Sequence, residues 1–212
     1  MSTEKVFRHS VTVRWSHWLV AISGILLLFS GFGQLPMYPR YNVVKIPGFA
    51  WSGDFSNTLL LHYISAAFFT AAVVFHMIYH LRRREFGMLP KDGDMGETLA
   101  TVRAMFGKGE EPLHGKFQAK QRMAYAAIGG NSLLLIVTGL IKSWKNIGPI
   151  TIDPLLLQIV TLIHTVIGMV FMALFIAHIA ALLLYRPLIP SMFTGRISKD
   201  YVREHHPGWE TD

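Results

Sequence analysis

Apolar runs alternate with polar segments along the whole chain. Four runs, approximately residues 13–32, 59–81, 123–141 and 155–185, contain no Asp, Glu or Lys, and Arg14 stands only at the edge of the first. About 20 apolar residues cross the hydrocarbon core of a bilayer as an α-helix. Backbone polar groups in lipid must be satisfied within the chain, so the runs are expected to be helices. The pattern predicts an all-α membrane protein with four transmembrane helices, in which residues 1–212 form one integral-membrane domain.

Lys and Arg are concentrated on one side of these spans. Three lie before or at the edge of the first span, nine lie between the second and third, and four follow the last, whereas the two remaining connections hold only four of the 20. Cytoplasmic segments are enriched in Lys and Arg, so both termini and the long middle connection are expected in the cytoplasm. The first span is too long for a signal-peptide core and no small-x-small cleavage site follows it, so we expect it to be retained.

Composition supports the membrane interpretation. Hydrophobic residues make up 51% of the chain and charged residues only 16%, against about 25% in a typical soluble domain. The formal charge of +7 is expected to face anionic lipid and cytoplasm, so no nucleic-acid partner is predicted. Cysteine is absent, which excludes disulfides, thiolate iron–sulfur ligands and covalent haem attachment.

Histidines inside the spans are the candidate chemical groups. Of ten histidines, five lie well within spans, namely His17, His62, His76, His164 and His178, and His80 sits at the inner end of the second span. His164 and His178 are 14 residues apart, which places them on one helix face about 21 Å apart along the axis. His62 and His76 repeat this spacing in a parallel span, so His62 and His164 are expected to face each other at one depth, near the outer side.

Paired histidines at two depths are the arrangement that two bis-histidine haems require, and without cysteine the haems would be noncovalent b type. A tetrahedral zinc site fits two pairs so far apart less well. A glycine near a ligating histidine would let the flat haem macrocycle approach the helix backbone. Close packing between helices is the alternative explanation for each glycine. The glycines considered are Gly24, Gly31, Gly129, Gly130, Gly139 and Gly168. For the second ligand at the inner level, His17, His76 and His80 are all candidates.

Several segments resemble the cytochrome b556, or gamma, subunit of membrane-bound respiratory formate dehydrogenase. They are residues 14–18 (RWSHW), 61–62 (LH), 115–121 (GKFQAKQ), 162–164 (LIH) with His178, 195–198 (GRIS) and 205–209 (HHPGW). The resemblance implies a four-helix bundle with two b haems. It implies that His62 and His164 bind the outer haem iron, and His17 and His178 the inner one. His76 has no counterpart in the family pattern and remains the alternative inner ligand.

The resemblance also implies a site for menaquinone or another quinone beside the inner haem, at His178, Gln118, Lys120 and Gln121. The family pattern has Asn at the position of Gln118 and Gly at that of Lys120. No residue of this chain is expected to act on formate.

By resemblance, the chain is the quinone-reducing membrane subunit of an oxidoreductase complex in the bacterial cytoplasmic membrane. It would take electrons from an iron–sulfur (beta) subunit, and a molybdenum or tungsten pterin (alpha) subunit would oxidise formate. The nearest alternative is the cytochrome b subunit of a nickel–iron hydrogenase or thiosulfate reductase. A histidine-lined transporter or a structural anchor is a remoter one, because neither broken helices nor inverted repeats are evident.

Overall fold

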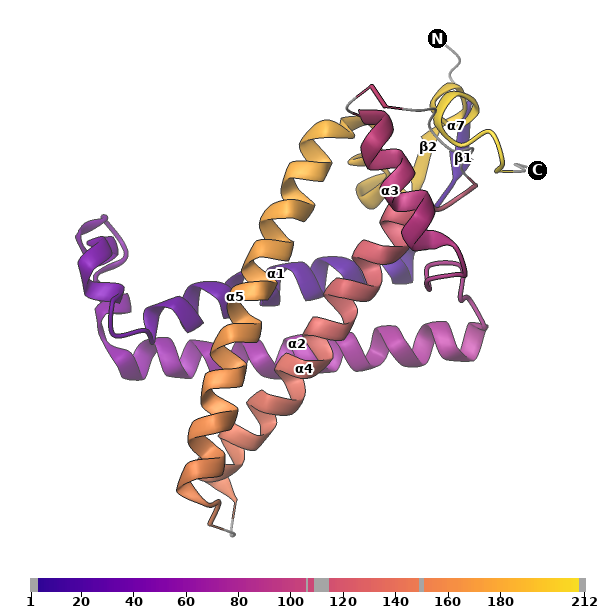
Figure 1. Ribbon diagram of the computed structural model, residues 1–212. Coiled ribbons are helices and arrows are strands. Elements are labelled where there is room, and N and C mark those ends of the chain that lie inside the picture. The colour runs from indigo at the N-terminus through magenta and orange to yellow at the C-terminus, as the bar shows by residue number, and fades with distance from the viewer. Residues whose placement is uncertain (1–3, 106, 109–114, 149–150, 210–212) are drawn as a thin grey trace. The chain divides into compact units, whose positions relative to one another are not determined.

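The computed structural model describes residues 4–105, 107–108, 115–148 and 151–209, with the side chains of Met105 and Ile147 not described. Four long helices dominate it: α1 (Val11–Gly33), α2 (Phe55–Arg83), α4 (Ala119–Ile147) and α5 (Pro154–Leu184) (Figure 1). Each has the length and the apolar composition needed to cross a membrane. Three of the predicted runs lie entirely within their helix, and the fourth extends one residue past the end of α5.

Local sequence explains where two of these helices begin. Asp54 precedes α2, and its Oδ1 accepts the N–H of Ser56 at 2.7 Å. Asp153 precedes α5, and its Oδ1 accepts the N–H of Leu156 at 3.0 Å. A side-chain oxygen at this position satisfies one of the free N–H groups of the first turn. Pro154 then occupies the first helical position, where its missing N–H costs nothing.

Burial in the long helices is the reverse of that in a soluble protein. Their buried side chains are often small and polar, as with Ser23, Ser30, Thr58, Ser65, Ser132 and Thr138, whereas Leu60, Phe68, Leu140, Leu162 and Leu183 are exposed. Small residues let membrane helices approach closely, while large apolar side chains face lipid. The distribution therefore fits helices packed together within a bilayer.

Short elements occupy the connections. The connection between α1 and α2 contains three 3₁₀ helices, η1 (Tyr38–Tyr41), η2 (Val43–Lys45) and η3 (Ala50–Gly53). The helix α3 (Asp94–Met105) lies in the long basic connection. After α5 come η4 (Arg186–Leu188), α6 (Ser191–Thr194) and α7 (Lys199–His205).

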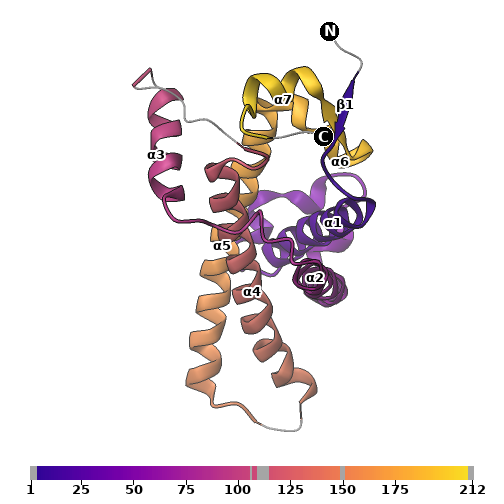
Figure 2. The ribbon, with the colours of Figure 1, turned by 90° about the vertical axis from the view of Figure 1, so that its right-hand side faces the viewer.

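A small antiparallel ladder joins segments near the two ends of the chain, and the pattern of apolar runs did not predict it. Strand β1 (Lys5–Phe7) pairs with β2 (Arg196–Ser198), with Val6 opposite Ile197. Gly195, whose φ of +77° suits glycine, ends α6, and its carbonyl accepts the N–H of Arg8 at 2.8 Å. Figure 2 shows β1 beside α6 and α7.

The chain divides into two compact units. The terminal unit, as we name it, comprises residues 1–14, 80–133 and 173–212, and the span unit comprises residues 15–79 and 134–172. Each long helix contributes residues to both. In the span unit, Phe69 and Phe171 meet edge to face at 6.0 Å. A Cβ at Gly24 would lie 3.5 Å from Phe69, so this glycine serves helix packing there.

Candidate functional site

His62 of α2 and His164 of α5 face each other inside the span unit. Their ring centroids are 6.4 Å apart, with an interplanar angle of 71°. Two imidazoles that share one metal ion through nitrogens at about 2 Å place their ring centres roughly 6 Å apart. The pair therefore has the separation that a two-histidine metal site requires, and it lies where the 14-residue spacing predicts.

The other ring nitrogen of each histidine is held by a buried hydroxyl. His62 Nδ1 is 3.0 Å from Ser30 Oγ of α1, and Ser30 is fully buried. His164 Nδ1 is 2.8 Å from Thr138 Oγ1 of α4. The span unit thus uses all four long helices to position two imidazoles.

These hydroxyls also determine which nitrogen of each imidazole carries the proton. Ser30 donates its proton to the carbonyl of Leu26 at 2.7 Å, and Thr138 donates to that of Leu134 at 2.7 Å. A hydroxyl has a single proton, so each oxygen is left to accept from a histidine Nδ1–H. We assign the Nδ1–H tautomer to both rings. The Nε2 lone pairs then remain for a metal, which is the usual arrangement of a ligating histidine and its hydrogen-bond partner.

A glycine follows each hydroxyl residue and lies against the same ring. A Cβ at Gly31 would lie 3.4 Å from Cε1 of His62, and one at Gly139 would lie 3.3 Å from Cε1 of His164. Both glycines therefore admit the imidazole itself. Gly129, Gly130 and Gly168 differ, because a Cβ there would meet no other atom within 4 Å.

Within the described part of the chain, no group of three or more histidine, cysteine or acidic side chains gathers around one point. A tetrahedral zinc centre needs three or four protein ligands. An octahedral iron whose other positions are filled by a macrocycle needs two. The donor set of this site consequently fits haem better than zinc.

The inner histidines are distributed between the two units. His17 and His76 belong to the span unit, whereas His178 belongs to the terminal unit. His76 Nδ1 lies 3.3 Å from Ser16 Oγ, and His17 packs edge-on against Trp18. Ser16 precedes Ser30 by 14 residues just as His62 precedes His76, so α1 and α2 repeat one serine–histidine contact at two levels.

Three of the four residues expected to contact quinone, Gln118, Lys120 and Gln121, lie where α4 begins, in the terminal unit. Gln118 is 5% exposed, and its N–H donates to Oε1 of Gln121 at 3.1 Å. Lys120 donates to the hydroxyl of Tyr185 at 2.8 Å and lies 4.5 Å from the centre of that ring. His178 lies in the same unit, seven residues before Tyr185 and on nearly the same face of the chain there.

Several of these positioning residues were missed by sequence reasoning. Ser30 and Thr138 are ordinary residues of apolar spans, and their only signal is a hydroxyl residue followed directly by glycine. The sequence predicts for Tyr185 only that it ends the fourth span. Its role beside Lys120 depends on contacts between segments far apart in the chain.

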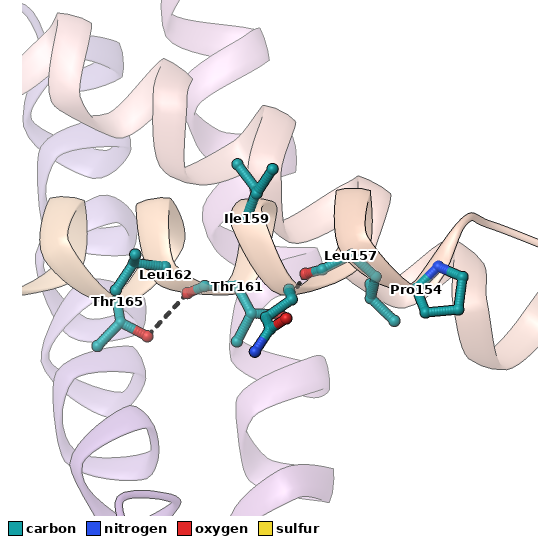
Figure 3. Close-up of a pocket in the computed structure, with 7 residues that line it drawn as sticks. Pro154, Leu157, Ile159, Thr161, Leu162 and Thr165 are labelled. Atoms are coloured by element: carbon teal, nitrogen blue, oxygen red, sulfur yellow. Dashed lines mark hydrogen bonds between the residues drawn. The ribbon is translucent and has the colours of Figure 1, made fainter.

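A shallow groove on α5 is a separate feature (Figure 3). The described residues that line it all belong to that helix, namely Pro154, Leu157, Gln158, Ile159, Thr161, Leu162 and Thr165. The hydroxyls of Thr161 and Thr165 donate to carbonyls of their own helix at 2.8 and 2.9 Å. The groove includes none of the predicted site residues, so we do not assign the site to it.

The chain is similar to known proteins along nearly its whole length. The chain is 25% identical to the cytochrome b556(Fdn) subunit of the nitrate-inducible formate dehydrogenase of Escherichia coli (strain K12), over 99% of this chain and 92% of the relative. It is 22% identical to the formate dehydrogenase cytochrome b556 subunit of Haemophilus influenzae, over 97% of this chain and 82% of that relative. The formate dehydrogenase cytochrome b556(fdo) subunit of Escherichia coli (strain K12) is 23% identical to it, over 97% of this chain and 92% of that relative. The resemblance drawn from the motifs is thereby confirmed.

A family model covers most of the chain as well. The model described as prokaryotic cytochrome b561 matches residues 8–195, which include all four long helices. Together with those membrane-spanning helices, this match identifies the chain as a member of the prokaryotic cytochrome b561 family, a multi-pass cytochrome b of the bacterial cytoplasmic membrane.

Proposed function

We propose that the chain is the membrane anchor and electron-transfer subunit of a formate dehydrogenase complex, delivering electrons from an iron–sulfur partner through two b haems to a quinone. Formate itself would be oxidised on a separate molybdenum or tungsten pterin subunit. The near full-length similarity to formate dehydrogenase cytochrome b556 subunits supports the donor. The observation that carries the proposal is the His62–His164 pair, with its 6.4 Å ring separation and two hydroxyl-bound Nδ1 atoms.

In this proposal His62 and His164 hold the outer haem through Nε2. A bound haem b supplies an iron that gains and loses one electron. Ser30 and Thr138 keep both imidazoles in the ligating tautomer, and donation from Nδ1–H raises their basicity. Phe69 and Phe171, each seven residues after one of these histidines, form an apolar layer on the same helix faces and exclude water from the interior there.

For the inner haem we propose His17 and His178, following the family pattern. His76 is the second candidate, because its contact with Ser16 repeats the His62–Ser30 contact. The choice is testable by His17→Ala and His76→Ala in the full chain. The ligand variant should lose the inner haem's low-spin signal in the electron paramagnetic resonance spectrum, and the other variant should keep both signals. Loss of the signal in His76→Ala alone would assign the position to His76.

Quinone reduction is proposed at the start of α4, near His178. The amides of Gln118 and Gln121 and the ammonium of Lys120 can donate hydrogen bonds to a quinone carbonyl and stabilise charge that develops on it. Tyr185 orients Lys120. Positive-inside topology would put this end in the cytoplasm, so protons for the quinone would come from that side.

Removal of these donors tests the quinone site in the complete complex. Gln118→Ala combined with Gln121→Ala should slow quinone reduction while formate still reduces the haems. Gln158→Ala, at the beginning of α5, is a matched control because it removes an amide from a position outside the proposed site. Unchanged turnover and unchanged inhibition by quinone analogues in the double variant would locate the site elsewhere.

Histidine replacement tests the outer haem directly. His62→Ala and His164→Ala should each remove about half of the dithionite-reduced minus oxidised haem absorbance, because an iron with one remaining ligand binds weakly. His205→Ala, outside the spans, should retain all of it. If either span variant kept two bis-histidine signals, the proposed pairing would be wrong.

The electron donor is tested in membranes that contain the complete complex. Formate should reduce both haems, and hydrogen or thiosulfate reductase substrates should not exchange electrons with them. Reduction by hydrogen without formate would instead favour a hydrogenase cytochrome b. The absence of any haem absorbance from the purified chain would favour a transporter or a structural anchor.

A further inference from the structure

Arg8 is buried in the terminal unit, and its guanidinium has no acceptor among the described residues. The residue is 6% exposed, and its backbone N–H is held by the carbonyl of Gly195 at 2.8 Å. A guanidinium has five N–H donors. No residue in the described ranges accepts a hydrogen bond from this one, and Nη1 is completely buried. Burial disfavours the charged form and lowers the pKa of Arg8.

Lys116 brings a second positive charge to the same place. Arg8 Cζ lies 5.9 Å from the ring centres of both Phe117 and Trp209, and Lys116 Nζ lies 5.6 and 5.4 Å from the same two centres. Burial, and then the charge of Arg8, lower the pKa of Lys116. Aromatic faces stabilise cations, but they leave the N–H donors without acceptors and do not remove the repulsion between the two charges.

The arrangement is held by contacts on both sides. The ladder of β1 with β2 fixes the segment before Arg8. The Nδ1–H of His206 donates to the carbonyl of Gly115 at 2.7 Å, which attaches the segment carrying Lys116 to the C-terminal segment carrying Trp209. The two cations are therefore positioned by structure that would remain if either were neutralised.

No carboxylate among the described residues neutralises the two cations. Glu85 is close enough to influence Lys116, but it accepts a hydrogen bond from Arg83 at 2.7 Å. Asp94 is bound by Arg122. Among the described residues, none forms an ion pair with Arg8 or Lys116. A buried cation without a counter-charge is strongly unfavourable, and none of the described residues supplies one here, so the cluster is suited to binding an anion.

We propose that Arg8 and Lys116 form a binding site for a phosphate-type oxyanion, supplied by the headgroup of an anionic phospholipid or by free phosphate. The planar fork of arginine matches phosphate oxygens in two parallel hydrogen bonds, and lysine adds a point charge. The proposal is independent of the haems and of the electron donor.

The location favours a lipid as the source. Lys116 lies three residues before α4 begins at Ala119, and seven residues before the apolar run that starts at residue 123. Side chains just outside a span lie at the depth of the lipid headgroups, where tryptophan and basic residues are enriched. Trp209 and Lys116 have this combination.

The test uses the full chain, purified with its haems and depleted of lipid. Dioleoylphosphatidylglycerol, dioleoylphosphatidylcholine and inorganic phosphate are added separately at constant ionic strength. We then measure the thermal unfolding midpoint, and we count the bound lipid molecules by native mass spectrometry. A ligand that binds only the folded state raises the midpoint with concentration. Lys116→Gln and Arg8→Gln should weaken binding by about tenfold or more, because each removes charge-assisted hydrogen bonds. Lys108→Gln removes the same charge from an exposed position and should bind as the parent does.

The outcomes separate the sources. Stabilisation by phosphatidylglycerol alone, lost in Lys116→Gln, identifies a lipid headgroup. Equal stabilisation by inorganic phosphate, lost in the same variant, identifies free phosphate. The site does not exist if neither anion stabilises the parent, or if Lys116→Gln and Lys108→Gln respond identically. Lys116→Gln keeps the test decisive if Arg8→Gln fails to fold, since Lys116 is only half-buried.

Discussion

Replacing Ser30 by alanine removes one hydroxyl and leaves the Nδ1–H of His62 without its acceptor. The hydroxyl is fully buried and 3.0 Å from Nδ1. A buried donor that loses its partner costs about 1–3 kcal/mol, which corresponds to roughly 5- to 150-fold in an equilibrium constant. Part of the cost can be avoided if the proton moves to Nε2, but that tautomer cannot ligate iron. We therefore expect outer-haem affinity to fall by about tenfold or more, as for other partners of metal-ligating histidines.

The same change should raise the midpoint potential of the haem that remains bound. Donation from Nδ1–H makes the imidazole more basic and stabilises the ferric state, so its loss favours the ferrous state. A difference of about 1 kcal/mol between oxidation states corresponds to roughly 40 mV for a one-electron couple. Potentiometric titration followed optically measures this shift, and haem content measured during dilution gives the affinity.

Ser23→Ala is a matched control within the same helix. Ser23 is buried seven residues before Ser30, and its hydroxyl donates to carbonyls of α1, at 2.6 Å to Leu19. It should leave haem content and both potentials unchanged. If Ser30→Ala and Ser23→Ala behaved alike, the assigned role of Ser30 in holding the His62 tautomer would be refuted.

Three further predictions follow from the same geometry. Lys142→Gln should lower the potential of the outer haem in a potentiometric titration, because Lys142 lies one turn after Thr138 on the same face of α4 and its charge acts on both His62 and His164. Gly139→Val should reduce outer-haem content in a pyridine haemochrome assay, since even a Cβ there would lie 3.3 Å from the His164 ring. The hydrogen bond from Arg122 lowers the pKa of Asp94 to about 2. The ionised Asp94 carboxylate therefore contributes fully to folding stability above about pH 4, and this contribution is lost as the pH falls toward 2. Thermal unfolding between pH 5 and pH 2 should show that loss, and Asp94→Asn should lack it.

The four spans were predictable from the length of the apolar runs, and the facing of His62 and His164 from the 14-residue spacing of the histidines. An apolar run of 20 residues has few alternatives to a helix, and a 14-residue spacing returns to one helix face at any tilt. The second inner ligand was not predictable in this way, since His17, His76 and His80 differ by about a turn in depth. The contact of His76 with Ser16 adds an observation that spacing cannot supply.

Other features were missed because they depend on tertiary contacts. Strands of three residues, such as β1 and β2, carry no periodic signal, and these are separated by almost the whole chain. A serine or threonine in a membrane helix usually bonds only to its own backbone, as Ser23 does, so Ser30 and Thr138 could not be distinguished beforehand. The unneutralised charge of Arg8 became evident only when its neighbours were known.

Haem stoichiometry tests the central claim most directly. The pyridine haemochrome assay on the purified full chain, referred to protein concentration from amino-acid analysis, counts noncovalent b haems per polypeptide. The two histidine levels predict two haems per chain, of which His164→Ala removes one. A value of one for the parent chain, or zero, would contradict the account.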